Sequence, residues 1–231
     1  MRHVFLIGGG RDPDGSHATN RPFADAVLAT GRDDVALIVL DEGEETNADE
    51  RAAALALVGL EPAVTIVAPG GPLPDVSGAA AVYVTGGLTP GYQAALCGDT
   101  SWLPGDIIYG GFSAGAAIAP SHALVGGWRL DRMQVCHEDN GEDLDDVEVR
   151  PGLGLLPDLI DVHCTQWGNL GRLVAVVRTE SRAGWGLDEH TTLELRDGQP
   201  VAVHGGGAAW HVQPEGDAVR VKVLRHGPLT P

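Results

Sequence analysis

The first half of the chain alternates short, continuous apolar runs with alanine-rich stretches of helical length, and this alternation restricts the fold more than any other feature. Apolar runs without alternating polar residues are typical of strands buried on both faces, and strands separated by helices favour a parallel sheet. Strands are expected over 4–7, 35–40, 64–68, 81–85 and 107–109. Helices are expected over 23–30, over 47–58 with Asn47 as N-cap, and up to residue 96 from Thr89 as N-cap and Pro90 at the first helical position. We therefore predict an α/β fold, a mostly parallel sheet with helices on both faces.

The second half of the chain changes character at an acidic segment, 138–148, which we expect to be a solvated loop. Apolar runs punctuated by Gly and Asp-Gly turns then predict strands over 159–163, 184–187, 191–195, 201–203, 208–212 and 219–223. The last of these favour a small antiparallel β extension at the C-terminus. No long linker or repeat interrupts the chain, so we predict a single α/β domain over 1–231.

Acidic residues dominate the charge, because 32 Asp and Glu stand against 15 Lys and Arg, a formal net charge of −17. Without a basic run, this charge argues against nucleic acid or an anionic membrane as a partner. No segment approaches the roughly 18 apolar residues of a membrane span, and the run at 4–7 is too short for a signal peptide. The three cysteines are widely spaced and form no disulfide framework. We expect a cytoplasmic protein.

The strongest functional motif is Gly111-Phe112-Ser113-Ala114-Gly115, which follows an expected strand and opens an expected helix over 114–119. Small residues let the chain turn sharply there, which lifts the serine hydroxyl clear of the sheet. The start of the helix also supplies backbone N–H donors. The motif predicts Ser113 as a nucleophile.

A serine nucleophile needs a general base and a group that orients the base. Among nine histidines, His163 ends an apolar strand, and ligand sites of parallel sheets gather at strand ends. Glu189 follows the apolar run 184–187, and the sequence leaves its neighbour Asp188 and the more distant Glu138 as alternatives for the acid.

Two further glycine-rich loops follow expected strands. The loop 85–89 can bring backbone N–H groups close to an oxyanion. The run Gly8-Gly9-Gly10 lacks the dinucleotide-binding pattern, so phosphate binding is not expected there. No Cys or His spacing indicates zinc, and the acidic segment lacks the order of a calcium-binding loop, so no metal or cofactor is expected.

The chain resembles the peptidase E/cyanophycinase family of serine peptidases, which have a class I glutamine amidotransferase-like fold. The resemblance covers nearly its whole length, and its later blocks look closer to cyanophycinase. The blocks that carry it are Leu6-Ile7-Gly8-Gly9, Val84-Thr85-Gly86-Gly87, 111–116, 152–157, Asp161-Val162-His163, Leu170-Gly171-Arg172-Leu173 and Gly186-Leu187-Asp188-Glu189.

The resemblance implies Ser113 as nucleophile, His163 as general base and Glu189 as the acid. It places the oxyanion-hole N–H groups on Gly87 and Ala114. The peptidase E version of the acid, an aspartate about fifteen residues after the serine, does not carry over, since position 128 is tryptophan.

The substrate side departs from the family pattern. The resemblance puts substrate-binding roles on Thr89, Gln166 and Arg172. Cyanophycinases typically carry a glutamine and two arginines where this chain has Val162, Trp167 and Asn169. Those family residues help to hold an anionic aspartyl substrate, so we expect substrate recognition to differ and cyanophycin itself not to be the substrate.

These observations predict a serine hydrolase that cleaves a peptide or isopeptide bond in a small substrate through an acyl-enzyme on Ser113. Glutamine amidotransfer is disfavoured because that chemistry uses a cysteine at the position of Ser113. Esterase activity on the same residues, and a catalytically silent protein that binds a small molecule or peptide, are the alternatives. A homodimer is compatible with the sequence.

Overall fold

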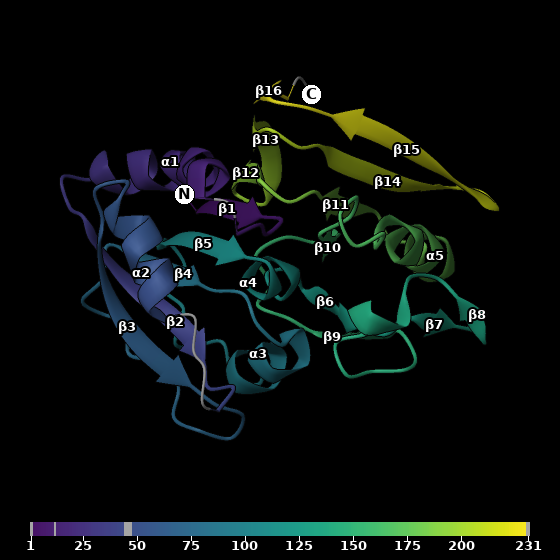
Figure 1. Cartoon of the computed structure of the whole chain (residues 1–231), viewed down its shortest axis with the longest axis horizontal. Coiled ribbons are helices and arrows are strands. Elements are labelled where there is room, and N and C mark those ends of the chain that lie inside the picture. Colours follow the sequence, from purple (N-terminus) through teal and green to yellow (C-terminus); the bar gives the residue numbers. More distant parts are fainter. Residues whose placement is uncertain (1, 12, 44–47, 230–231) are drawn as a thin grey trace.

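The computed structural model describes residues 2–11, 13–43 and 48–229. Its largest element is an eight-stranded sheet with the strand order β16-β13-β12-β1-β5-β4-β2-β3 (Figure 1). Five neighbouring strands run parallel: β1 (His3–Ile7), β5 (Ile108–Phe112), β4 (Ala81–Val84), β2 (Asp34–Leu40) and β3 (Glu61–Val67). Antiparallel strands extend the sheet beyond β1: β12 (Thr191–Arg196), β13 (Gln199–Gly205) and β16 (Gly227–Pro228).

Helices cover both faces of the parallel part, as predicted. On one face, Phe5 and Ile7 of β1 share an apolar cluster with Phe23 of α1 (Pro13–Leu28) and Leu55 of α2 (Ala48–Ala56). On the other face, the intervening residues of β1 pack in a cluster with α3 (Thr89–Leu96) and α4 (Ala114–Ala117). A strand buried on both sides must be apolar at every position, which is why the uninterrupted runs predicted these strands.

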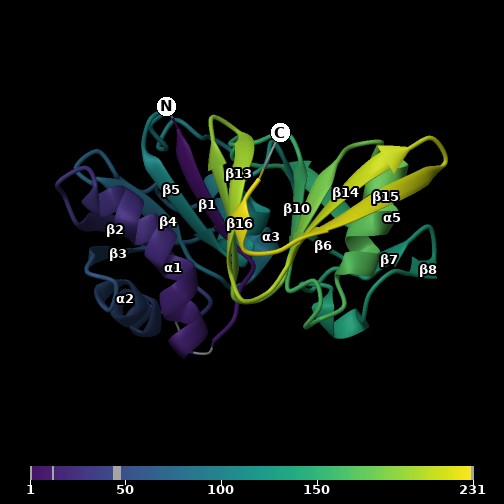
Figure 2. The ribbon, with the colours of Figure 1, turned by 90° about the horizontal axis from the view of Figure 1, so that it is seen from above.

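A second sheet lies beside the first, which the sequence did not predict (Figure 2). Its order is β10-β11-β14-β15, formed by β10 (Leu159–Val162), β11 (Gly184–Leu187), β14 (Ala209–Glu215) and β15 (Ala218–Leu224). β10 and β11 are parallel and are joined through α5 (Leu170–Glu180). Leu173, Val176 and Val177 of α5 cover one face of this sheet. The predicted antiparallel extension is therefore divided between the two sheets.

A smaller lobe is built from residues 122–151. β6 (His122–Gly126) pairs with β9 (Glu148–Pro151), and β7 (Arg129–Leu130) pairs with β8 (Met133–Gln134). The acidic segment begins with a 3₁₀ turn, η1 (Glu138–Asn140). This segment is not simply a solvated loop, because Glu142 accepts a hydrogen bond of 3.0 Å from the N–H of Thr89 in α3.

Several helix boundaries differ from the prediction; for example, α4 ends at Ala117 and not at residue 119. Thr89 is the first residue of α3 and Leu88 is the N-cap, whose side chain has no acceptor for a capping bond. The carboxylates of Glu42 and Glu142 accept from the N–H groups of Leu88 and Thr89 in its place. α1 begins ten residues before the predicted start and contains Pro22. Asn47 lies outside the described residues. None of the helices in the described ranges is long and apolar enough to cross a membrane.

Candidate active site

The chain reverses direction sharply between β5 and α4, and Ser113 lies at that turn. Ser113 has φ 52° and ψ −111°, and its N–H donates to Ile7 O at 2.9 Å. The flanking glycines are required for space: a Cβ on Gly111 would lie 2.5 Å from Gly115 O, and one on Gly115 would lie 2.2 Å from Val84 O. Strained backbone of this kind is held only where the surrounding structure enforces it, and it points the hydroxyl away from the sheet.

Ser113, His163 and Glu189 form a continuous hydrogen-bonded chain. Ser113 Oγ lies 2.8 Å from His163 Nε2, and His163 Nδ1 lies 2.8 Å from Glu189 Oε1. An ionised carboxylate can only accept, so Nδ1 carries the imidazole proton and Nε2 is free to accept from the serine hydroxyl. The geometry is that which nucleophilic catalysis by serine requires.

The glycine run after β1 makes room for the imidazole. A Cβ on Gly9, which has φ 104°, would lie 2.0 Å from His163 Cε1. The N–H of His163 also donates to Gly8 O at 3.1 Å. The glycines of this run are therefore needed to place His163 beside Ser113, a role that the sequence did not reveal.

The structure distinguishes Glu189 from the two other acids considered. The carboxylate of Asp188 is buried and accepts hydrogen bonds from Thr165, Ala208 and Trp210. Glu138 is exposed in η1. Only Glu189 of the three is hydrogen-bonded to the imidazole. Its own N–H donates to Gln166 Oε1 at 2.9 Å, so Gln166 fixes the backbone of the acid.

Burial is the main influence on the imidazole. It lowers the pKa of His163 below its usual value, while the hydrogen bond and charge of Glu189 act in the opposite direction. The indole of Trp167 stacks on the same ring, with centroids 3.8 Å apart. A neutral imidazole is the form that can accept a proton from serine.

The candidate oxyanion-hole N–H groups belong to Ala114 and Gly87. Ala114 is the first residue of α4, and an N–H at that position has no acceptor within its own helix. Gly87, at φ 152°, belongs to the loop between β4 and α3, and a Cβ there would meet the carboxylate of Glu42 at 2.8 Å. Glu42 in turn accepts from the N–H of Leu88 at 2.6 Å.

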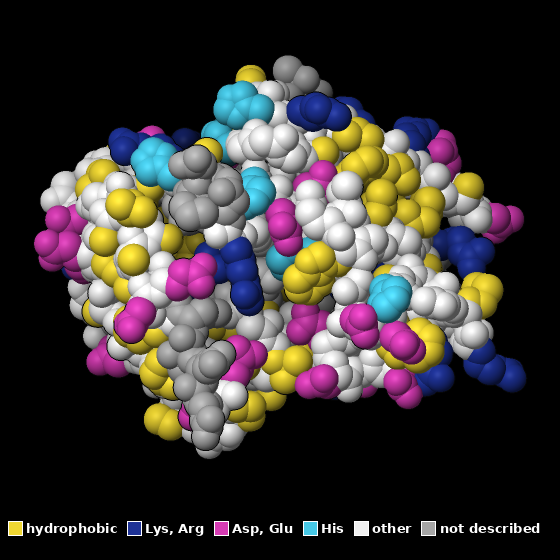
Figure 3. All heavy atoms as spheres, viewed as in Figure 1, with side chains coloured by type: hydrophobic (Ala, Val, Ile, Leu, Met, Phe, Trp, Pro, Cys, Tyr) yellow, Lys and Arg dark blue, Asp and Glu magenta, His cyan; other side chains and the backbone are white. Residues whose placement is uncertain are grey.

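A cavity of about 660 Å³ opens over these groups, and Figure 3 shows this part of the surface as a hollow rimmed by acidic, basic and histidine side chains. Its lining comes from distant parts of the chain, including Arg51 of α2, the loop 86–88 between β4 and α3, and Glu142 of the acidic segment. Burial raises the pKa of Glu142, against the opposing effect of its hydrogen bond from Thr89.

The three residues given substrate-binding roles by resemblance do not line this cavity. Thr89 is buried at the start of α3, and Gln166 holds the backbone of Glu189. Arg172 is 3% exposed, and its Nε and Nη2 donate to the two carboxylate oxygens of Asp161 at 2.9 and 2.7 Å. Its Nη1 donates to Gly127 O and Asn140 O, so Arg172 anchors the lobe 122–151 to the second sheet.

The residues lining the cavity that the sequence did not assign to the site include Glu42, Arg51 and Trp167. Trp167 was noted only as a replacement. Arg51 follows Asp49 and Glu50 in an alanine-rich helix, where charged residues are ordinarily solvent-facing, so no local signal marks it.

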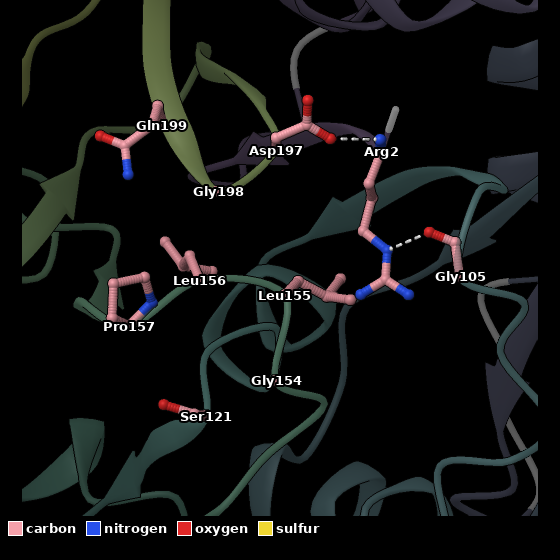
Figure 4. Close-up of a pocket in the computed structure, with 10 residues that line it drawn as sticks. All are labelled: Arg2, Gly105, Ser121, Gly154, Leu155, Leu156, Pro157, Asp197, Gly198 and Gln199. Atoms are coloured by element: carbon pink, nitrogen blue, oxygen red, sulfur yellow. Dashed lines mark hydrogen bonds between the residues drawn. The ribbon is translucent and has the colours of Figure 1, made fainter.

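A second cavity, of about 560 Å³, lies at the opposite, amino-terminal end of the parallel strands (Figure 4). Arg2, just before β1, donates through Nε to Gly105 O at 2.9 Å and through its N–H to Asp197 at 2.8 Å. Arg2 is thus hydrogen-bonded to neighbouring residues of the protein. Within the described part of the chain, no group of three or more His, Cys, Asp or Glu side chains is arranged to hold a metal ion.

The fold and site define an α/β protein with a serine at a sharp turn after a strand of the parallel sheet. No family model matches the chain. It is 34% identical over 141 residues to a cyanophycinase of Trichormus variabilis, covering 55% of this chain and 44% of that protein. A cyanophycinase of Geminocystis herdmanii is 29% identical over 162 residues, covering 64% and 53%. The chain spans about half the length of the curated relatives it matches.

Among solved structures, a peptidase from an acI-B1 actinobacterium has a TM-score of 0.69 and 18% identity, and the match covers 98% of this chain and 95% of that one. At this identity the likeness is one of fold. The partial matches to cyanophycinases agree with the resemblance of the sequence to a peptidase E/cyanophycinase-like family.

Proposed function

We propose that this protein is a serine hydrolase that cleaves a peptide or isopeptide bond in a small substrate through an acyl-enzyme on Ser113. The observation that carries the proposal is the hydrogen-bonded chain from Ser113 Oγ through His163 to Glu189, with both contacts at 2.8 Å, at the floor of a cavity. Its relatives include proteins named cyanophycinase, which agrees with hydrolysis of an amide.

In the first half of the reaction, Ser113 Oγ attacks the scissile carbonyl carbon while its proton passes to His163 Nε2. Glu189 holds the Nδ1 proton and stabilises the imidazolium that forms. The carbonyl oxygen becomes an oxyanion, which accepts from the N–H groups of Gly87 and Ala114. The imidazolium then protonates the leaving nitrogen as the C–N bond breaks, and an ester on Ser113 remains.

In the second half, water enters the place of the departed amine. His163 Nε2 takes a proton from the water as its oxygen attacks the ester carbonyl. Collapse of this second tetrahedral intermediate breaks the bond to Ser113 Oγ, which recovers its proton from His163. A carboxylic acid leaves, and the side chains return to their starting states without a metal or cofactor.

The substrate class follows from the size of the site. A cavity of about 660 Å³ falls among sites of roughly 300–1,000 Å³ that take small molecules. Such a volume suits a dipeptide or a short isopeptide better than a folded protein.

A cytoplasmic location, a single domain and a homodimer stay predictions.

A catalytically silent binding protein is the second candidate, and Glu42 is the observation that favours it. Its carboxylate lies so close to Gly87 that a Cβ there would be 2.8 Å from an oxygen. A negative charge beside an oxyanion hole opposes the oxyanion. Esterase activity would use the same groups as amide hydrolysis, since both pass through the same intermediate.

The test is intact-mass spectrometry after treatment with a fluorophosphonate, comparing wild type with Ser113→Ala. One adduct that is lost in the variant supports the proposal, and a dipeptide and isopeptide library then identifies the bond. A well-folded wild type that forms no adduct and turns over no member of the library would leave the binding protein as the better account.

A further inference from the structure

Arg51 is a buried cation whose hydrogen-bonding capacity is not filled by the described residues. It lies on α2, its side chain is 5% exposed, and it lines the same cavity as Ser113. Its Nε is buried and has no hydrogen-bond acceptor within reach in the described structure. A buried guanidinium is costly unless it is paired and hydrogen-bonded.

The contacts that Arg51 does make are weak substitutes for a carboxylate. Its guanidinium carbon lies 4.0 Å from the centre of the Phe112 ring, a cation–π contact. Its one ion pair, within the described ranges, is with Glu50 at 3.3 Å, and the Glu50 side chain is 56% exposed. Exposed ion pairs of this kind contribute little.

Arg172 shows how the same protein satisfies a buried guanidinium completely. That side chain has both oxygens of Asp161 and two backbone carbonyls as acceptors. Arg51 has no such partner among the described residues, although it is buried to a similar degree. The difference is that Arg51 borders a cavity.

The acids of the cavity nearest to α3 are already engaged elsewhere. Glu42 accepts from the N–H of Leu88, and Glu142 accepts from the N–H of Thr89. Glu189 is bonded to the imidazole of His163. Arg51 therefore remains a cation facing the space where a substrate would lie, stacked on the residue that precedes the nucleophile.

We propose that Arg51 binds a carboxylate of the substrate and so selects small amide substrates that carry one. The guanidinium fork matches a carboxylate in two parallel hydrogen bonds, which a neutral carboxamide cannot reproduce. As a statement about a substrate, this inference rests on the proposed function. Arg51 acts in recognition and takes no part in the bond changes.

The experiment is isothermal titration calorimetry with two pairs of capped amino acids, which needs no turnover. N-acetyl-aspartyl methylamide is compared with its asparaginyl counterpart, and the glutamyl with the glutaminyl derivative, so that each pair differs only in carboxylate against carboxamide. Wild type, Arg51→Met and Arg51→Lys are titrated. Arg21→Met is the control for loss of a charge, because Arg21 is half-exposed, paired with Asp25 on α1 and outside this cavity.

We expect wild type and Arg21→Met to bind at least one carboxylate probe ten-fold or more tightly than its carboxamide. Arg51→Met should lose that preference, and Arg51→Lys should keep part of it, since lysine retains the charge without the planar fork. A wild type that binds no carboxylate probe, or that shows no preference in either pair, overturns the inference. A folded Arg51→Met variant that keeps the preference also overturns it. If that variant does not fold, an undiminished preference in Arg51→Lys overturns it.

This outcome is separate from that of the proposed function. A protein that prefers carboxylates through Arg51, but forms no fluorophosphonate adduct and turns over no member of the library, would retain the anion site and refute the hydrolase. A protein that is labelled on Ser113 but shows no preference for carboxylates would support the hydrolase and refute the role of Arg51.

Discussion

The indole ring of Trp167 stacks on the imidazole of His163, with ring centroids 3.8 Å apart and ring planes 7° apart. Trp167 is 43% exposed and the imidazole beneath it is buried, so the indole shields one face of the candidate base from water. The backbone supports the stack, because the N–H of Trp167 donates to His163 O at 2.8 Å and its carbonyl accepts from Asn140 Nδ2 at 2.5 Å.

Replacing Trp167 with Ala should shift the acid limb of the pH–rate profile to higher pH. Burial lowers the pKa of His163 in the native protein, and opening one face to water reduces that effect, so the pKa rises. The imidazole is then protonated, and unable to act as a base, up to a higher pH. The rate of fluorophosphonate labelling against pH measures the shift. Trp167→Phe keeps a stacked ring and should move the limb less, whereas a shift to lower pH in the Ala variant would mean that the indole mainly stabilises the imidazolium.

Loss of charge at Glu189 should lower activity, whereas loss of charge at its neighbour Asp188 should lower stability. Glu189→Gln keeps the size of the side chain but removes the acceptor-only partner of Nδ1, so the favoured tautomer is lost. In a comparable triad such a change lowers kcat about 10⁴-fold, and we expect a fall of roughly that order with an unchanged melting temperature.

Asp188→Asn is the matched change. Its carboxylate accepts from Thr165, Ala208 and Trp210, and an amide cannot accept all of these bonds. Each unsatisfied buried donor costs about 1–3 kcal/mol, so this variant should lose free energy of unfolding. Kinetics and thermal unfolding of both proteins decide the matter, and loss of activity in Asp188→Asn alone would reverse the assignment of the acid.

Arg172 should prove to be a stabilising residue. Arg172→Met leaves the carboxylate of Asp161, which is 2% exposed, without its partner. Breaking a buried pair from one side costs about 3–5 kcal/mol, which urea unfolding can measure. The double variant Arg172→Met/Asp161→Asn should recover part of the loss. Removing the exposed pair of Arg21 with Asp25 should cost at most about 1 kcal/mol, and a similarly small cost at Arg172 would contradict the structural role.

The sequence predicted the parts of the protein that depend on local pattern. Continuous apolar runs identified the parallel strands, because burial on both faces demands them, and the motif around Ser113 identified the turn between β5 and α4. His163 and Glu189 were singled out as polar residues at strand ends, and the structure brings both to Ser113. Their catalytic roles stay predictions.

What the sequence could not predict depends on contacts between distant segments. The strands 159–162 and 184–187 are buried like the central strands of the main sheet, and nothing in their local sequence says that they join a different one. Arg172 was given a substrate-binding role from its motif, whereas its side chain is hydrogen-bonded to the buried carboxylate of Asp161. Arg51 resembles any charged residue on an exposed helix, and only the packing of α2 against Phe112 turns it into the cavity.

Gly9 offers a test of the site that touches none of its reacting groups. A Cβ at this position would lie 2.0 Å from His163 Cε1, so Gly9→Ala should push the imidazole away from Ser113. We expect the labelling rate of Ser113 to fall by at least ten-fold, because proton transfer requires the 2.8 Å contact between Oγ and Nε2. Gly31→Ala is the matched control: its φ of 80° is also positive, but no atom lies within 4 Å of the added Cβ, so it bears the backbone strain alone. Equal labelling rates in the two variants would show that the imidazole does not depend on the space at Gly9, whereas a loss confined to Gly9→Ala would tie the reactivity of Ser113 to the position of His163.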